Sequence, residues 1–128
     1  MATVLGVGGV FIKCADPEAS KAFYRDVLGA QENEYGGFHF LHGCANARFG
    51  DGARTIFAHF EADAEYFAPS EHAFMLNLMV DDLDAVIERI RAAGLSLEGE
   101  PERYGYGAFA WVMDPNGIKV ELWQPAAP

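Results

Sequence analysis

Glu121 is the residue whose type and position most directly indicate chemistry in this chain. It lies in the run 119–124, which follows a Pro115-Asn116-Gly117 turn and alternates like a β-strand. Successive strand residues point to opposite faces, so Lys119, Glu121 and Trp123 share one face. Glutamate is uncommon inside strands, and a specific role for Glu121 is therefore expected.

Two roles for Glu121 stay open. In the first, the carboxylate forms a salt bridge with Lys13 or Lys119 and only holds the sheet together. In the second, a desolvated Glu121 acts as a general base or as a hydrogen-bonding group for a bound molecule. The residues that share its face decide between these roles.

The elements that must position this face repeat along the chain. An aspartate begins a predicted helix in each half and a glycine ends it, and each half also has a turn signal near its end. These signals recur 65 residues apart, at Asp16 and Asp81, at Gly29 and Gly94, and at Asp51 and Asn116. Agreement of three signals at one offset indicates an internal duplication of half a domain.

Alternating runs predict four strands in each half of the chain. We expect them at about 7–14, 31–35, 38–42 and 54–60, and again at about 74–80, 96–102, 108–113 and 119–124. The predicted fold class is α+β, with two tandem βαβββ modules forming a curved mixed sheet around a cavity. A single domain over residues 1–128 would hold the first module at about 5–60, a linker at about 61–73 and the second module at about 74–125.

Composition and charge exclude several classes of function. The net charge of −10 disfavours nucleic acid and anionic membrane surfaces as partners. No stretch is long and apolar enough for a membrane span, and the first ten residues lack the pattern of a signal peptide. The two cysteines, Cys14 and Cys44, are expected to be reduced thiols, so we expect a cytoplasmic protein.

Three motifs resemble those of the vicinal oxygen chelate superfamily, which holds glyoxalase I, the bleomycin-resistance proteins and extradiol dioxygenases. The motifs run from Asp16-Pro17 to Phe23-Tyr24-Arg25-Asp26-Val27-Leu28-Gly29, from Val80-Asp81-Asp82-Leu83-Asp84 to Ala93-Gly94, and from Asp114-Pro115-Asn116-Gly117 to Glu121-Leu122. The resemblance covers almost the whole chain. It implies the fold more specifically than the function, because one fold supports many reactions.

The resemblance also implies where a metal would bind. Metal-dependent members use up to four His, Gln or Glu ligands from the sheet faces, and these positions fall on Gly9, Ile56, Met75 and Glu121. Three of the four cannot coordinate a metal, so no metal or other cofactor is expected. The alternative is a divalent ion held by Glu121 with His39, His42 or His59.

The remaining candidates are substrate-binding residues that alternation or a flexible loop places near Glu121. Two tyrosines between glycines, in the loop 102–107, suit the rim of a pocket, and residues 66–69 are either a second part of that rim or a linker. The predicted substrate-binding residues are Phe11, Lys13, Met75, Asn77, Met79, Tyr104, Tyr106 and Trp123. The alternative is a filled core in which methionine fills gaps.

Three functions are therefore expected from the residues and the resemblance. The first is a protein without the usual metal site that binds or transforms a small apolar or aromatic metabolite, with Glu121 as the catalytic residue. The second is a metal-dependent lyase, isomerase or dioxygenase with displaced ligands. The third is a drug-sequestering resistance protein without catalysis. A small-molecule ligand and a homodimer are the expected partners.

Overall fold

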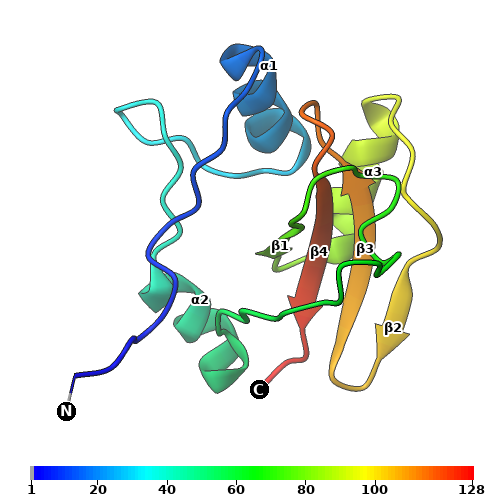
Figure 1. Ribbon diagram of the computed structural model, residues 1–128. Helices are drawn as coiled ribbons and strands as arrows, with labels where there is room; N and C mark the ends of the chain where they lie inside the picture. Colours follow the sequence, from blue (N-terminus) through cyan, green and yellow to red (C-terminus); the bar gives the residue numbers. More distant parts are fainter. Residues whose placement is uncertain (1) are drawn as a thin grey trace.

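A four-stranded sheet built by the second half of the chain is the centre of the computed structural model, which describes residues 2–128 (Figure 1). The strands lie in the order β1-β4-β3-β2, with β1 parallel to β4 and β3 antiparallel to both of its neighbours. Their bounds are β1 (Leu76–Met79), β2 (Glu102–Tyr104), β3 (Gly107–Met113) and β4 (Lys119–Pro125). The predicted α+β class and mixed sheet are confirmed.

The hairpin that joins β3 to β4 is fixed by a buried aspartate. The Asp114 carboxylate accepts the backbone N–H groups of Asn116 and Ile118, each at 2.8 Å. Gly117 has a φ of +77°, a conformation that residues with a Cβ rarely adopt. The turn therefore sets the register of the hairpin, with Met113 opposite Lys119.

Helix α3 (Leu83–Ala92) covers one face of the sheet. The Asp82 carboxylate caps it by accepting the Ala85 N–H at 3.1 Å, one residue after Asp81, to which the 65-residue offset points. Leu83 and Ile90 are fully buried against Val120 and Leu122 of β4. Each such side chain stabilises the fold by about 1.5–3 kcal/mol through removal of apolar surface from water.

The first helix joins the same core. Helix α1 (Pro17–Ala22) is capped by Asp16 and continues as the π-helical turn η1 (Phe23–Val27). Phe23 and Tyr24 are buried in the cluster that contains α3 and the sheet. The chain then leaves the helix at Gly29, whose φ is +84°.

Two sets of polar contacts tie this first helix to the second half. The Tyr24 hydroxyl donates to the Asp114 carboxylate at 2.6 Å. Burial and this hydrogen bond raise the pKa of Tyr24 well above its ordinary value. The Arg89 guanidinium donates to the carbonyl oxygens of Val27 and Leu28 at 3.0 and 3.1 Å, where the helix leaves its last carbonyls unpaired.

The strands predicted in the first half are not formed in the described residues. The runs 7–14 and 54–60 have no strand pairing, and the runs 31–35 and 38–42 are represented by one isolated bridge between Glu32 and Phe38. Helix α2 (His42–Phe49) and the 3-10 turn η2 (Gly50–Gly52) follow where a strand end and a hairpin turn were expected. A strand needs a neighbour for its backbone groups, and among the described residues these runs have no strand pairing beyond that one bridge.

The predicted strand at 96–102 also differs. Strand β2 begins only at Glu102, because Gly99 has a φ of +80° and Pro101 has no N–H to donate to a ladder. The order of two tandem modules stays a prediction. No helix among residues 2–128 has the length and apolar character needed to cross a membrane.

Candidate functional site

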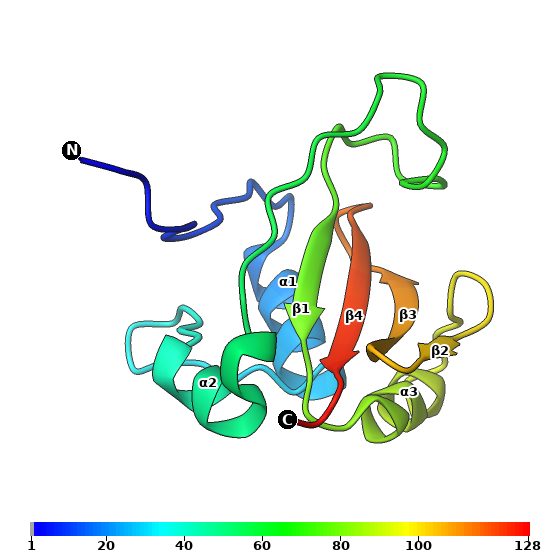
Figure 2. The same cartoon turned by 90° about the horizontal axis from the view of Figure 1, so that it is seen from below.

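The candidate site is the sheet face opposite α3. Figure 2 shows α3 on one side of the sheet and the loop that precedes β1 on the other. The register places Asn77 opposite Glu121 and Glu121 opposite Trp111, with all three side chains on this second face. The alternation predicted from the sequence of β4 is therefore confirmed.

Glu121 is surrounded by hydrogen-bond donors from three elements. Its Oε1 accepts the Asn77 side-chain amide at 2.6 Å, and its Oε2 accepts the Trp111 indole N–H at 2.8 Å. The Tyr66 hydroxyl, from the loop before β1, also donates to Oε2. We call Tyr66, Asn77, Trp111 and Glu121 the carboxylate cluster. Hydrogen bonds of this kind to a charged acceptor are stronger than neutral ones.

Lys119 is a buried cation beside this cluster. Only 9% of its surface is exposed, and its ammonium group donates to the Tyr66 carbonyl oxygen at 2.7 Å. The same nitrogen lies 5.2 Å from the centre of the Tyr66 ring, within the range of a cation–π contact. Among the described residues, neither Lys119 nor Lys13 forms an ion pair with Glu121, so the salt-bridge role considered for Glu121 is wrong.

The Tyr66 hydroxyl is held as a donor. Burial, followed by the hydrogen bond to Glu121, raises the pKa of Tyr66 above its ordinary value. A second bond reaches its oxygen from the Trp111 indole N–H at 3.0 Å. The phenol is therefore neutral at physiological pH and is both a donor and an acceptor.

Aromatic side chains extend from this cluster toward β2. Phe109 and Trp123 stack with their ring centres 6.5 Å apart, and Tyr104 stacks on Tyr106 at 5.1 Å. Both tyrosine rings lie 6.2 Å from Phe109. We call these four residues the aromatic row. The structure thus places Tyr104, Tyr106 and Trp123 together on one side of Glu121.

The other predicted binding residues are divided between this face and the first half. Met79 lies opposite Trp123 on β1, and Met75 immediately precedes that strand. Phe11, in contrast, is 96% exposed, and Lys13 lines a groove of about 310 Å³ beside the start of α1. The chain does not bring Phe11 or Lys13 to Glu121.

The groups around Glu121 do not fit a divalent cation. Amide, indole and phenol donors point at its oxygens, where a metal would need further oxygen or nitrogen ligands. Within residues 2–128, no group of three or more His, Cys, Asp or Glu side chains is arranged to hold an ion. The histidines considered as displaced ligands, His39, His42 and His59, belong to the first half.

Two cluster members were not identified from the sequence. The position of Trp111 could have been predicted, because a hairpin that turns at residues 115–117 places Trp111 opposite Glu121. Tyr66 was considered only within residues 66–69, as either part of the pocket rim or a linker, because a loop has no periodicity that places a side chain. Its role follows only from the tertiary contact.

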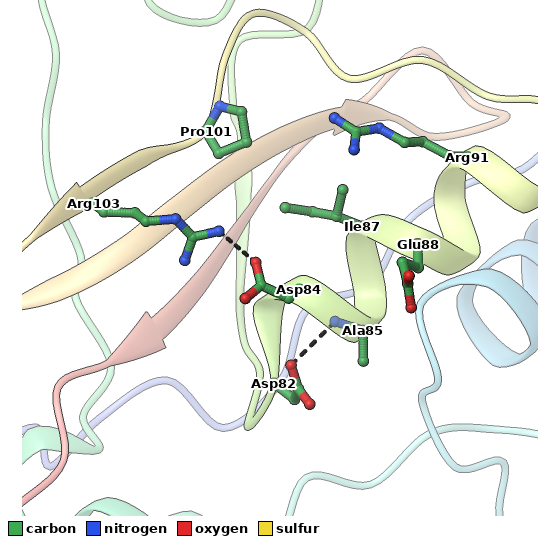
Figure 3. Close-up of a pocket in the computed structure, with 8 residues that line it drawn as sticks. All are labelled: Asp82, Asp84, Ala85, Ile87, Glu88, Arg91, Pro101 and Arg103. Carbon is green, nitrogen blue, oxygen red and sulfur yellow. Dashed lines mark hydrogen bonds and ion pairs between the residues drawn. The ribbon is translucent and has the colours of Figure 1, made fainter.

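A groove of about 390 Å³ lies between α3 and β2, away from the carboxylate cluster (Figure 3). Arg103 donates to Asp84 across it, and Asp82, Glu88 and Arg91 add further charges to its walls. Three carboxylates and two guanidinium groups leave the groove with a formal net charge of only −1. Its composition does not favour one class of ligand.

The chain belongs to the Glyoxalase/Bleomycin resistance protein/Dioxygenase superfamily, whose family model matches residues 6–122. Solved structures with the same fold include the fosfomycin resistance protein FosX from Listeria monocytogenes, with 15% identity, a TM-score of 0.58 and coverage of 97% of this chain and 96% of that chain. TnmS3, an antibiotic binding protein from Streptomyces sp. CB03234, has 21% identity and a TM-score of 0.53, covering 96% and 100%. A glyoxalase/dioxygenase from Nostoc punctiforme has 17% identity and a TM-score of 0.56, covering 98% of each chain. No protein of curated function matches the chain.

Proposed function

We propose that this protein binds a small apolar or aromatic molecule on the sheet face that carries the carboxylate cluster and the aromatic row. The observation that carries the proposal is the position of Glu121, a carboxylate on a face rich in aromatic rings. Binding sites for small molecules commonly combine apolar walls with a few fixed polar groups. The face opposite α3 has this composition.

Glu121 is the group that would recognise or activate the ligand. Its carboxylate only accepts hydrogen bonds, so it favours a ligand with an O–H or N–H donor, and it can take a proton as a general base. Asn77 and Trp111 hold the carboxylate in place. The aromatic row offers flat surface for stacking against a ring. Binding is proposed independently of turnover.

The test is a ligand screen followed by one substitution. Thermal shift and tryptophan fluorescence identify compounds that bind the wild-type protein. We expect Glu121→Gln to weaken binding of such a compound about tenfold or more, because a charged acceptor becomes neutral. Glu100→Gln, the same change at an exposed position, is the matched control and should leave binding unchanged. Equal affinities for wild type and Glu121→Gln would contradict the proposal.

We also propose that the protein forms a homodimer. The unpaired runs 7–14 and 54–60 expose large apolar side chains, with Phe11 96% and Phe57 77% exposed. Strand β1 pairs only with β4 and has a free edge for another strand. Monomeric soluble proteins rarely expose large apolar patches, and a second copy of the chain offers both a strand and an edge for pairing.

Molar mass in solution tests the dimer. Light scattering after gel filtration should give twice the chain mass of 14.0 kDa. Phe11→Asp should shift the protein toward monomer, because it places a charge in the apolar run. Tyr35→Asp changes another exposed aromatic residue outside the runs 7–14 and 54–60 and serves as the control. A monomer at micromolar concentration would overturn this proposal.

A further inference from the structure

Tyr66 is the one member of the carboxylate cluster that does not belong to the sheet. It lies in the segment 61–73, which crosses the sheet face before β1 begins (Figure 1). We call this segment the strap. Ser70 and His72 hold it to the turn between β3 and β4, through the Gly117 carbonyl at 2.7 Å and the Asn116 carbonyl at 2.9 Å. Lys119 of β4 donates to the Tyr66 carbonyl at 2.7 Å.

The phenol of Tyr66 is bound as a separate small molecule would be bound. Its hydroxyl donates to Glu121 and accepts from the Trp111 indole. Its ring meets Trp111 edge to face, with centres 6.2 Å apart and planes at 89°, and its face lies over the Lys119 ammonium. These are hydrogen-bonding, aromatic and cation–π contacts in one place. Yet Tyr66 is 41% exposed and is joined to the core by the strap alone.

We infer that Tyr66 occupies the place of a phenolic ligand, and that a small molecule with a ring hydroxyl takes this place when the strap moves away. This inference rests on the proposed function and names the ligand class for the same sheet face. A neutral phenol can reproduce the three contacts of the Tyr66 side chain, because it donates to Glu121, accepts from the Trp111 indole and presents its ring to Lys119.

Other ligand classes fit the same contacts less well. An anionic ligand would meet the Glu121 carboxylate, and a cationic ligand would meet the buried Lys119 ammonium. An aromatic ring without a hydroxyl could neither donate to Glu121 nor accept from Trp111, which would keep only the bonds that Glu121 makes with Asn77 and with Trp111. The geometry thus selects for a hydroxyl on a ring.

Competition by the strap has a measurable consequence. A side chain tethered near its own site acts at an effective concentration in the millimolar range. A free phenol must displace Tyr66 and the strap contacts before it binds. Removal of the Tyr66 side chain should therefore strengthen phenol binding by about tenfold or more, because it removes the competitor.

The experiment uses 4-methylphenol, the side chain of tyrosine as a free molecule. Toluene lacks its hydroxyl, and 4-methylanisole keeps the oxygen without the donor. The chain has two tryptophans, so the indole N–H signals of Trp111 and Trp123 can be followed separately by NMR. In Tyr66→Ala, we expect 4-methylphenol to shift the Trp111 signal and to bind about tenfold more tightly than in wild type, with both analogues about tenfold weaker.

Matched variants separate the outcomes. Tyr35→Ala removes another exposed tyrosine and should bind 4-methylphenol as the wild type does. Tyr66→Phe keeps the ring and removes only the hydroxyl, so it serves as the second variant if Tyr66→Ala does not fold. It should increase the affinity for 4-methylphenol less than Tyr66→Ala does. Equal binding of toluene and 4-methylphenol, or no change at Trp111 in either Tyr66 variant, would overturn the inference. If a different compound still binds in a Glu121-dependent way, the proposed function survives; if nothing binds this face, both fail.

Discussion

The two halves of this chain carry similar sequence signals 65 residues apart, but only the second builds a sheet. Each half has a helix capped by an aspartate: Asp16 accepts the Ala19 N–H at 3.2 Å, and Asp82 accepts the Ala85 N–H at 3.1 Å. The second half adds four paired strands and most of the core, whereas the first adds unpaired runs and α2. Local signals therefore suffice for helices, but strands also require neighbours.

One pair of equivalent positions makes the difference concrete. Leu122 on β4 is fully buried, with β1 and β3 on its two sides and α3 beneath it. Phe57, 65 residues earlier, is 77% exposed. Both residues are large and apolar, and both occur in alternating runs. What separates them is long-range pairing, which no local pattern specifies.

The largest expected effect comes from truncating this pair. Leu122→Ala should lower the free energy of unfolding by about 2–5 kcal/mol, because it leaves a cavity in the core. Phe57→Ala should change it by no more than about 0.5 kcal/mol in a monomer. Urea unfolding measures both. A comparable loss of stability in Phe57→Ala would contradict the exposed position of Phe57. If that loss disappears when the protein is diluted, a second copy of the chain covers Phe57.

Asp114 should have the next largest effect. Asp114→Ala removes the acceptor of two backbone N–H groups and of the Tyr24 hydroxyl, all within 2.8 Å. We expect a loss of about 2–4 kcal/mol in the free energy of unfolding, because buried donors are left unpaired. Asp51→Ala, in the exposed turn of the first half, is the control and should be nearly neutral. Similar losses of stability in Asp114→Ala and Asp51→Ala would contradict the structural role given to the Asp114 turn alone.

The contact between Tyr24 and Asp114 also predicts a dependence on pH. The pKa of Tyr24 is raised in the folded protein by burial and by Asp114, so the folded state keeps this proton to higher pH than the unfolded state. Its contribution to stability is complete below about pH 10 and is lost as the pH rises further. Urea midpoints between pH 8 and pH 11 should fall more steeply for wild type than for Tyr24→Phe. Tyr106→Phe, at an exposed position, should keep the wild-type slope.

Substitutions at the two helix caps should have the smallest effects, and they compare the first half of the chain directly with the second. Asp82→Ala and Asp16→Ala each remove one cap hydrogen bond and should each lower the free energy of unfolding by about 1 kcal/mol. Equal effects, measured by denaturant unfolding, would mean that both helices unfold with the core. A loss confined to Asp82 would mean that the first helix detaches before the rest.

Much of the second half could be predicted from its sequence, because its signals are local. The cap at Asp82, the turn at Gly117 and the alternation around Glu121 each depend on neighbouring residues. Asn77 was placed on the face of Glu121 by the same alternation, and the two side chains lie in contact.

The rest could not be predicted, because it depends on contacts between distant parts of the chain. Tyr66 meets Glu121 across 55 residues, from a segment that its composition indicates to be a linker. The runs around Phe11 and Phe57 have strand-like alternation, but alternation does not supply an edge to pair with. Helix α2 has no apolar stripe at helical spacing, so the sequence did not predict a helix there.

The polar ties of the first helix have a consequence for how the chain folds as it is made. The polar groups of the second half that hold this helix, Arg89 and Asp114, are both synthesised later than the helix itself. The buried side chains of this helix, Phe23 and Tyr24, therefore leave the ribosome before the core that covers them has been made. We expect chaperones to bind the nascent chain during that interval, and slow translation of the final hairpin to lengthen it.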